Sequence, residues 1–120
     1  MSWSSVNFDT DVFWSAGNPT RLTVPGALAG QFIVVAEIQW ANNATGYREL
    51  TIRKNGSVIL ANLQGPAVAS GECEQILTCL LTLAAGDYIE LLVNQLSGGS
   101  LNTATVASYA PTFSITFMGS

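Results

Sequence analysis

Short apolar runs separated by turn-forming residues are the feature that most constrains how this chain folds. The runs are rich in Val, Ile, Leu, Thr, Phe and Tyr, clusters of Gly, Pro and Asn separate them, and helical periodicity is nearly absent. This pattern predicts an all-β protein, an antiparallel sandwich or jelly roll of about 8–10 strands in a single domain over residues 1–120. We expect strands at 6–8, 12–14, 21–24, 32–40, 48–54, 57–61, 75–83, 88–96 and 112–118.

The dipeptide Asn55-Gly56 gives the most specific local prediction. Both residues tolerate a positive φ, so they favour a two-residue type I′ turn between two of the expected strands. Such a turn places Ile52 opposite Ile59 and Leu50 opposite Ala61, because a hairpin turn fixes the register of its strands.

Several expected strands carry apolar side chains on both faces, whereas a two-layer sandwich needs them only on the inner one. Only 10% of the residues are charged, against about 25% in typical globular chains. Scattered surface apolar residues are one explanation. We favour burial against neighbouring protomers, in an obligate interface of more than about 2,000 Å². The expected interface residues are Ile33, Val35, Val58, Leu60, Ile76, Leu80, Tyr88 and Leu92.

Composition excludes several functional classes. The chain has no histidine, which removes the usual general base of hydrolases and the usual zinc ligand. Its 4 basic residues against 8 acidic ones are too few to neutralise nucleic acid or an anionic membrane. No apolar run reaches the length of about 20 residues that spans a bilayer. We therefore expect a protein that is not an enzyme and that needs no cofactor.

Cysteines and carboxylates are the remaining candidates for metal or acid–base chemistry. Cys73 and Cys79 on one extended strand would lie about 20 Å apart, so they can pair only if the chain turns between them or with another chain, and we expect free thiols. Two thiolates without histidine fall short of the four ligands of a metal site. Asp9 and Asp11 could contribute oxygens to calcium, but nothing nearby completes the set that calcium needs. A further acidic pair, Glu72 and Glu74, lacks the spacing of a glycosidase across a cleft.

Cationic residues form the first of two groups of candidate binding residues. Arg48, Arg53 and Lys54 are close in sequence and could hold an anionic sugar or the carboxylates of a partner. Pairing with surface acids such as Glu49 is the alternative. Arg21 could pair with an acid on a neighbouring chain.

Tryptophans form the second group. Trp3 and Trp14 lie near the N-terminus and are candidates for docking on another chain or for stacking on sugar rings. Residues 1–10 are accordingly a candidate docking or edge segment. Trp40 continues the face of Phe32 and Ile38, so it is expected to cap the core.

Four segments along residues 12–118 resemble the globular head of complement subcomponent q, in the tumour-necrosis-factor-like superfamily. The segment LTLAAGDYIEL, residues 81–91, is the most specific and is similar to the family's strand–Gly-Asp–strand pattern. The final segment departs from the family because Ile115 stands where a closing glycine is expected. The other matches are TVP with GQF at 23–25 and 30–32, the KNG hairpin within 46–56, and FSI at 113–115.

This resemblance implies a jelly roll that assembles as a homotrimer around a threefold axis and has a binding or structural role. Residues 8–16 and 19–22 look more like bacteriophage and bacterial versions than animal ones, and no collagen-like repeat occurs. The expected function is a virion structural protein, a fibre tip, spike or decoration that contacts other virion proteins and a host surface glycan or protein. With no leader pattern, we expect synthesis in the host cytoplasm. The alternative is a secreted or surface carbohydrate- or protein-binding module.

Overall fold

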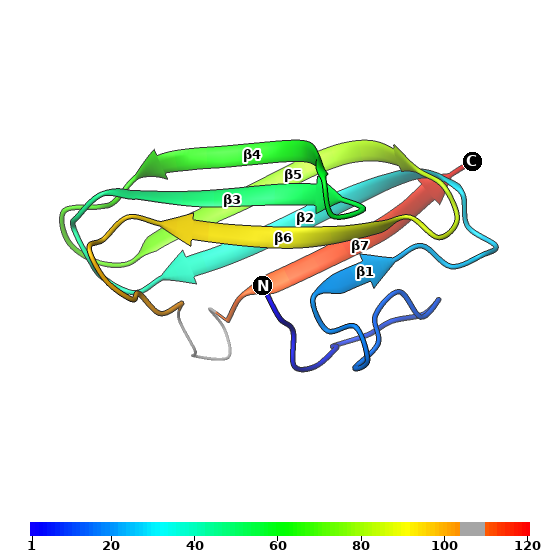
Figure 1. Ribbon diagram of the computed structural model, residues 1–120, viewed down its shortest axis with the longest axis horizontal. Helices are drawn as coiled ribbons and strands as arrows, with labels where there is room; N and C mark the ends of the chain where they lie inside the picture. Colours follow the sequence, from blue (N-terminus) through cyan, green and yellow to red (C-terminus); the bar gives the residue numbers. More distant parts are fainter. Residues whose placement is uncertain (104–109) are drawn as a thin grey trace.

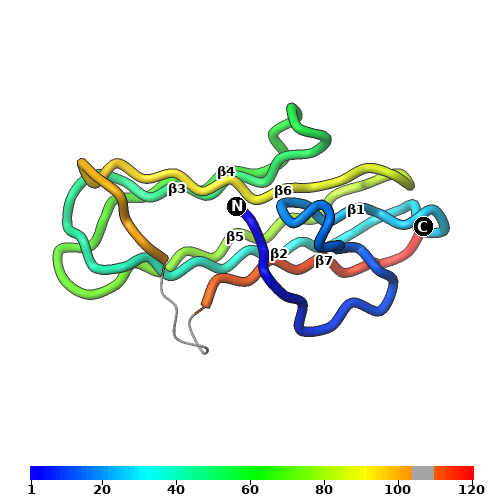
Figure 2. The backbone as a smooth tube through the Cα atoms, turned by 60° about the horizontal axis from the view of Figure 1, so that its bottom comes forward, coloured from blue at the N-terminus to red at the C-terminus, as the bar shows by residue number. Residues whose placement is uncertain are grey.

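The structure is a computed structural model that describes residues 1–103 and 110–120, and these residues form strands but no helix. Four strands form one antiparallel sheet in the order β1-β6-β3-β4, and three form a second sheet in the order β5-β2-β7. The two sheets stack as a β-sandwich (Figure 1; Figure 2). The strands are β1 (Arg21–Thr23), β2 (Gly30–Trp40), β3 (Tyr47–Lys54), β4 (Val58–Pro66), β5 (Cys73–Leu83), β6 (Tyr88–Gln95) and β7 (Thr112–Gly119).

The core lies between the two sheets and is built by alternation along their central strands. Every second residue of β2, from Phe32 to Trp40, is buried, as the apolar period of two predicts. Side chains of β3 and β6 in the other sheet complete the core, among them Leu50, Ile52 and Leu91, each fully buried. The expectation that Trp40 caps the core is confirmed, because only 2% of it is exposed.

The N-terminal segment bridges the two sheets on the side where β6 and β7 lie. The amino group of Met1 donates a 2.8 Å hydrogen bond to the carbonyl of Leu91 on β6. Trp3 stacks on Phe113 of β7, with 5.8 Å between the ring centroids. Figure 2 shows this segment passing from the level of β6 past β7. The segment therefore covers an edge of the core that the strands leave open.

The strands expected at 6–8 and 12–14 are wrong. Phe8 is 84% exposed, and Val12 has φ 62°, a conformation that a β-branched residue in a strand does not adopt. The Asp9 carboxylate instead accepts hydrogen bonds from the backbone N–H groups of Phe13 and Trp14, at 2.8 and 2.9 Å. This side-chain bonding offers the backbone an alternative to a ladder. The remaining seven expected strands are confirmed, with shifted ends.

The hairpin at Asn55-Gly56 has the expected turn and a different register. Asn55 and Gly56 have φ 51° and 79°, as a type I′ turn requires. Lys54 pairs with Val58, so Ser57 joins the loop and shifts the register by one residue, and a bulge beside Ile52 shifts it by one more. Ile52 therefore pairs with Ala61, and Leu50 with Leu63. The expected pairings with Ile59 and Ala61 are therefore wrong. The bulge adds local twist, and Figure 2 shows the tip of this hairpin rising out of its layer.

Candidate binding surfaces

Half of the expected interface residues come together on the outer face of the β5-β2-β7 sheet. Ile33 of β2 pairs directly with Leu80 of β5, and Ile76 of β5 pairs with Glu37, two residues beyond Val35. Leu80 is 65% exposed and Ile76 53%, whereas Ile33 and Val35 on the central strand are half-buried. We call Ile33, Val35, Ile76 and Leu80 the apolar face.

Small hydroxyl side chains surround the apolar face, and charges are scarce around it. Thr78 pairs with Val35, and Thr116 and Ser114 of β7 pair with Ile33 and Val35 from the other side. The three strands of this sheet contain only two charged residues, Glu37 and Glu74, and no cation. This surface therefore has the low charge expected of a surface that another molecule covers.

The other expected interface residues lie in the second sheet and do not join the apolar face. Val58 and Leu60 belong to β4, beside the hairpin turn, and Val58 is 49% exposed. Tyr88 and Leu92 belong to β6 and are half-buried. The sequence pattern thus combined residues that the fold distributes over two separate surfaces.

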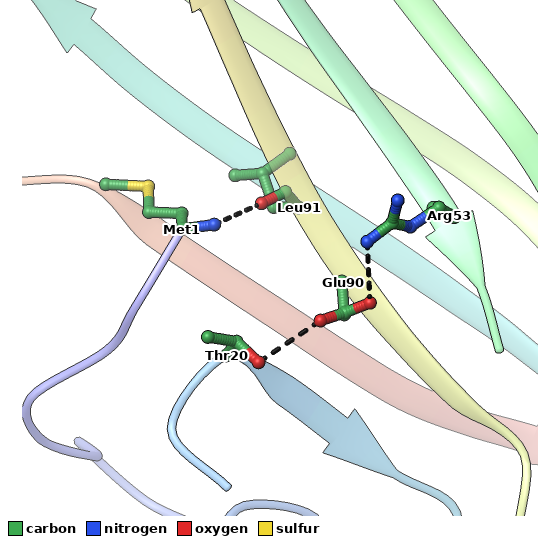
Figure 3. Close-up of polar contacts among 5 residues, drawn as sticks. All are labelled: Met1, Thr20, Arg53, Glu90 and Leu91. Carbon is green, nitrogen blue, oxygen red and sulfur yellow. Dashed lines mark hydrogen bonds and ion pairs between the residues drawn. The ribbon is translucent and has the colours of Figure 1, made fainter. Parts of the chain in front are cut away.

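The polar side chains on the outer side of the β1-β6-β3-β4 sheet centre on the carboxylate of Glu90. Arg53 donates to Glu90 Oε1 at 3.1 Å, and the Thr20 hydroxyl donates to Oε2 at 3.1 Å. Figure 3 shows both donors converging on this carboxylate, with the Met1 amino group close by on Leu91. Burial lowers the pKa of the Met1 amino group, against the opposing effect of Glu90. The Glu90 carboxylate on β6 is therefore hydrogen-bonded to Arg53 of β3 and to Thr20, the residue directly before β1.

Arg21 lies beside this network without joining it. The Cα atoms of Arg21 and Glu90 are register partners on β1 and β6. Both Glu90 oxygens are already engaged, and the Arg21 guanidinium carbon lies 4.0 Å over the Tyr88 ring centroid. Cation–π stacking orients a guanidinium, and in the described residues the Arg21 Nε–H is buried without a hydrogen-bond partner. In the described part of the chain, no ion pair engages Arg21.

The expected basic cluster of Arg48, Arg53 and Lys54 does not form, because Arg48 is fully buried. Its guanidinium donates to the backbone carbonyls of Asn43, Thr45 and Tyr47, at 2.7, 3.0 and 2.9 Å. A charge can be buried where hydrogen bonds satisfy it. Arg48 therefore fixes the loop before β3 and is unavailable to an anionic ligand, while Arg53 is paired with Glu90.

A buried polar bridge near Arg48 escaped the sequence analysis. Gln75 of β5 accepts a 3.0 Å hydrogen bond from the Trp40 indole N–H and donates a 3.0 Å bond to the Arg48 carbonyl. This side chain joins the two sheets at one end of the core. The position of Gln75 in the sequence could have indicated this role, because the alternation of β5 turns its side chain inward, where it is only 7% exposed.

Trp3 and Trp14 lie on the molecule as anchors of the N-terminal segment. Trp3 is stacked on Phe113, and the backbone N–H of Trp14 donates a hydrogen bond to the Asp9 carboxylate. The Trp14 indole N–H also donates to the Pro19 carbonyl at 3.4 Å. Both residues line a groove of about 790 Å³ between this segment and β7. Both rings are half-buried, so neither is an open stacking platform for a sugar.

No cation site is assembled by the candidate acids. Both Asp9 oxygens accept backbone hydrogen bonds, and Asp11 is exposed with only the neighbouring Thr10 hydroxyl bonded to it. Glu72 and Glu74 are also exposed. Within residues 1–103 and 110–120, no group of three or more Cys, Asp or Glu side chains is placed to hold a metal ion.

The two cysteines are free, as expected, and both lie on β5. Cys73 is buried and Cys79 is half-buried. Burial raises the pKa of the Cys79 thiol, because the thiolate would lose hydration. A raised pKa is the opposite of the activation that a nucleophilic cysteine needs.

Comparison with known proteins gives no relative. No protein-family model matches the chain, and no curated protein matches it. In the described residues, no helix is long and apolar enough to cross a membrane.

Proposed function

We propose that this chain is a non-enzymatic structural protein of a phage-like virion, a fibre tip, spike or decoration, and that it assembles as a homotrimer of jelly rolls. The observation that carries the proposal is the apolar face. Ile76 and Leu80 are more than half exposed on a sheet that has no cation in its strands. Contiguous apolar surface on a folded chain marks an interaction site, and covering it with other copies removes the cost of leaving it in water.

The strand order supports the jelly-roll part of the proposal. Strands β5, β6 and β7 are consecutive in sequence, yet β5 and β7 lie in one sheet and β6 in the other. Consequently β6 pairs with β1 and β3, which are distant in sequence. Connections that repeatedly cross between two antiparallel sheets are typical of jelly rolls. The resemblance stated for residues 81–91 agrees with this topology, and the virion role rests on the likeness of residues 8–16 and 19–22 to bacteriophage versions.

Measurement of the molar mass in solution tests the assembly. We expect size-exclusion chromatography with light scattering to give three times the chain mass at micromolar concentration. Leu80→Glu should return the chain to a monomer while its circular dichroism stays that of the wild type, because Leu80 is exposed and outside the core.

One substitution on polar surface is the matched control. Ser100→Glu introduces the same charge in an exposed loop outside both sheets. It should leave the mass unchanged. A monomeric wild type, or loss of assembly in Ser100→Glu as well as in Leu80→Glu, would contradict the proposed role of the apolar face.

A further inference from the structure

The carboxylate of Glu37 requires a partner if the apolar face is covered. Glu37 lies on β2, the central strand, between Ile76 of β5 and Thr112 of β7. Within the described residues it takes part in no ion pair. Covering the face with a second copy would remove water from this carboxylate. Burial of an unpaired charge is strongly unfavourable, so a stable contact here needs a cation opposite Glu37.

The cation must come from outside the sheet, because its strands contain none. The chain has four Lys and Arg side chains, and a fifth cation, the Met1 amino group, is hydrogen-bonded to the Leu91 carbonyl. Arg48 is buried, and Arg53 is paired with Glu90. Neither Lys54 nor Arg21 takes part in an ion pair within the described residues. Of these two, Arg21 is the guanidinium, and its planar set of donors matches the geometry of a carboxylate.

The surroundings of Arg21 present its guanidinium in a form suited to a carboxylate. The ring of Tyr88 supports one side of the group at 4.0 Å. The register partner that would neutralise it, Glu90, already accepts from Arg53 and Thr20. Arg21, Glu90 and Arg53 thus form a row across β1, β6 and β3, with a guanidinium on each side of the carboxylate. The row has a net charge of one positive unit, whereas the charged residues in the strands of the β5-β2-β7 sheet are all negative.

We propose that Arg21 of one copy pairs with Glu37 of the next copy, so that the outer side of the β1-β6-β3-β4 sheet meets the apolar face of its neighbour. The proposal rests on the assembly stated under the proposed function and names the two surfaces involved. Because these surfaces differ, the contact is heterologous, and such a contact closes into a ring or continues as an open chain. A homotrimer corresponds to a closed ring of three copies.

Charge reversal tests this pairing in the full-length chain. We expect Glu37→Arg alone and Arg21→Glu alone to raise the dissociation constant by at least about 30-fold, as loss of a buried interfacial charge pair does. The double variant Glu37→Arg/Arg21→Glu should recover the wild-type molar mass by light scattering, since every contact again joins opposite charges. Lys54→Glu and Asp11→Arg repeat the two charge changes elsewhere and should leave the mass unchanged.

The outcomes separate this inference from the proposed assembly. A wild type that assembles while both single variants also assemble, or a double variant that stays dissociated, overturns the pairing and leaves the role of the apolar face intact. A wild type that is monomeric overturns both. If a reversal variant fails to fold by circular dichroism, Glu37→Gln and Arg21→Gln provide the same test. Their effects on the dissociation constant should be coupled, and independent effects contradict the pairing.

Discussion

Asn55 and Asp87 lie 32 residues apart and are joined by a 2.8 Å hydrogen bond from Asn55 Nδ2 to Asp87 Oδ1. The same amide accepts a 2.9 Å bond from the backbone N–H of Tyr88. Asp87 uses its other oxygen for the N–H of Ala84, at 2.9 Å. The hairpin turn and the Gly86-Asp87 turn are thus locked together at one end of the sandwich. Asn55 meets both needs, because it tolerates positive φ and carries both a donor and an acceptor.

This contact predicts a loss of stability in acid. The hydrogen bond from Asn55, followed by that from the Ala84 N–H, holds the pKa of Asp87 below its ordinary value of 3.8. The folded state therefore favours the carboxylate. Its contribution to stability is complete above pH 3.8 and is lost as the pH falls through the lower folded value. Urea unfolding measured between pH 7 and pH 2 should show this loss.

Asp87→Asn isolates the contribution of the charge. The amide keeps an acceptor but has no carboxylate to protonate. We expect the variant to be less stable than the wild type at pH 7 and the difference to diminish below pH 3.8, where the wild-type group becomes neutral. Asp11→Asn, at an exposed acid, serves as the control. A stability difference that stays constant from pH 7 to pH 2 would contradict the assignment.

Gly46→Ala should destabilise the chain severely. Gly46 has φ 75°, and a Cβ there would collide with the carbonyl oxygen of Leu96 at the end of β6. Gly98→Ala is the matched control, since Gly98 has φ 90° and nothing within 4 Å of the added carbon. The control should cost about 1–2 kcal/mol from the left-handed backbone alone. Gly46→Ala should lower the free energy of unfolding clearly more than Gly98→Ala does, as measured by thermal or urea unfolding. Equal losses in the two variants would show that the close approach to Leu96 is easily relieved.

Arg48→Met should lower the free energy of unfolding by about 2 kcal/mol or more, because each buried carbonyl left without a donor costs about 1–3 kcal/mol. The carbonyls of Asn43 and Thr45, in the loop before β3, depend on this guanidinium, whereas the Tyr47 carbonyl also accepts from the Leu96 N–H. Arg53→Met removes one of the two hydrogen bonds that Glu90 accepts and leaves the bond from Thr20 in place, so it should cost less than Arg48→Met. Urea unfolding of both variants provides the comparison. Similar costs would mean that water reaches the carbonyls around Arg48.

The contrast between these two arginines shows what a sequence can and cannot predict. Alternation located β2 and most of β5 and β6, because the period of two follows directly from strand geometry. Arg48 is buried at the same period of two as Leu50 and Ile52, whereas its charge led to the prediction of a surface cluster with Arg53 and Lys54. Its burial depends on carbonyls of a loop whose conformation is not local to Arg48. Tertiary partners of this kind leave no periodic signal.

The candidate binding surfaces were predictable to a similar extent. Apolar residues on both faces of β2 and β5 correctly indicated exposed apolar side chains such as Ile76 and Leu80. Their separation from Val58 was not predictable, because it depends on which strands share a sheet. The strands predicted in the N-terminal segment do not form. The Asp9 carboxylate accepts hydrogen bonds from the backbone N–H groups of Phe13 and Trp14, and these bonds compete with strand pairing.

The two cysteines should differ in their reaction with a thiol reagent such as Ellman's reagent. Burial raises the pKa of Cys79 above its ordinary value of 9.0, so the thiolate is scarce at pH 8 and the native chain should react slowly there. Cys73 is buried and should react only after unfolding in urea. Cys73→Ser and Cys79→Ser assign the two phases. If native Cys73 reacts as fast as the unfolded chain, this end of β5 opens readily, and the bridge that Gln75 forms between the sheets is weaker than its hydrogen bonds indicate.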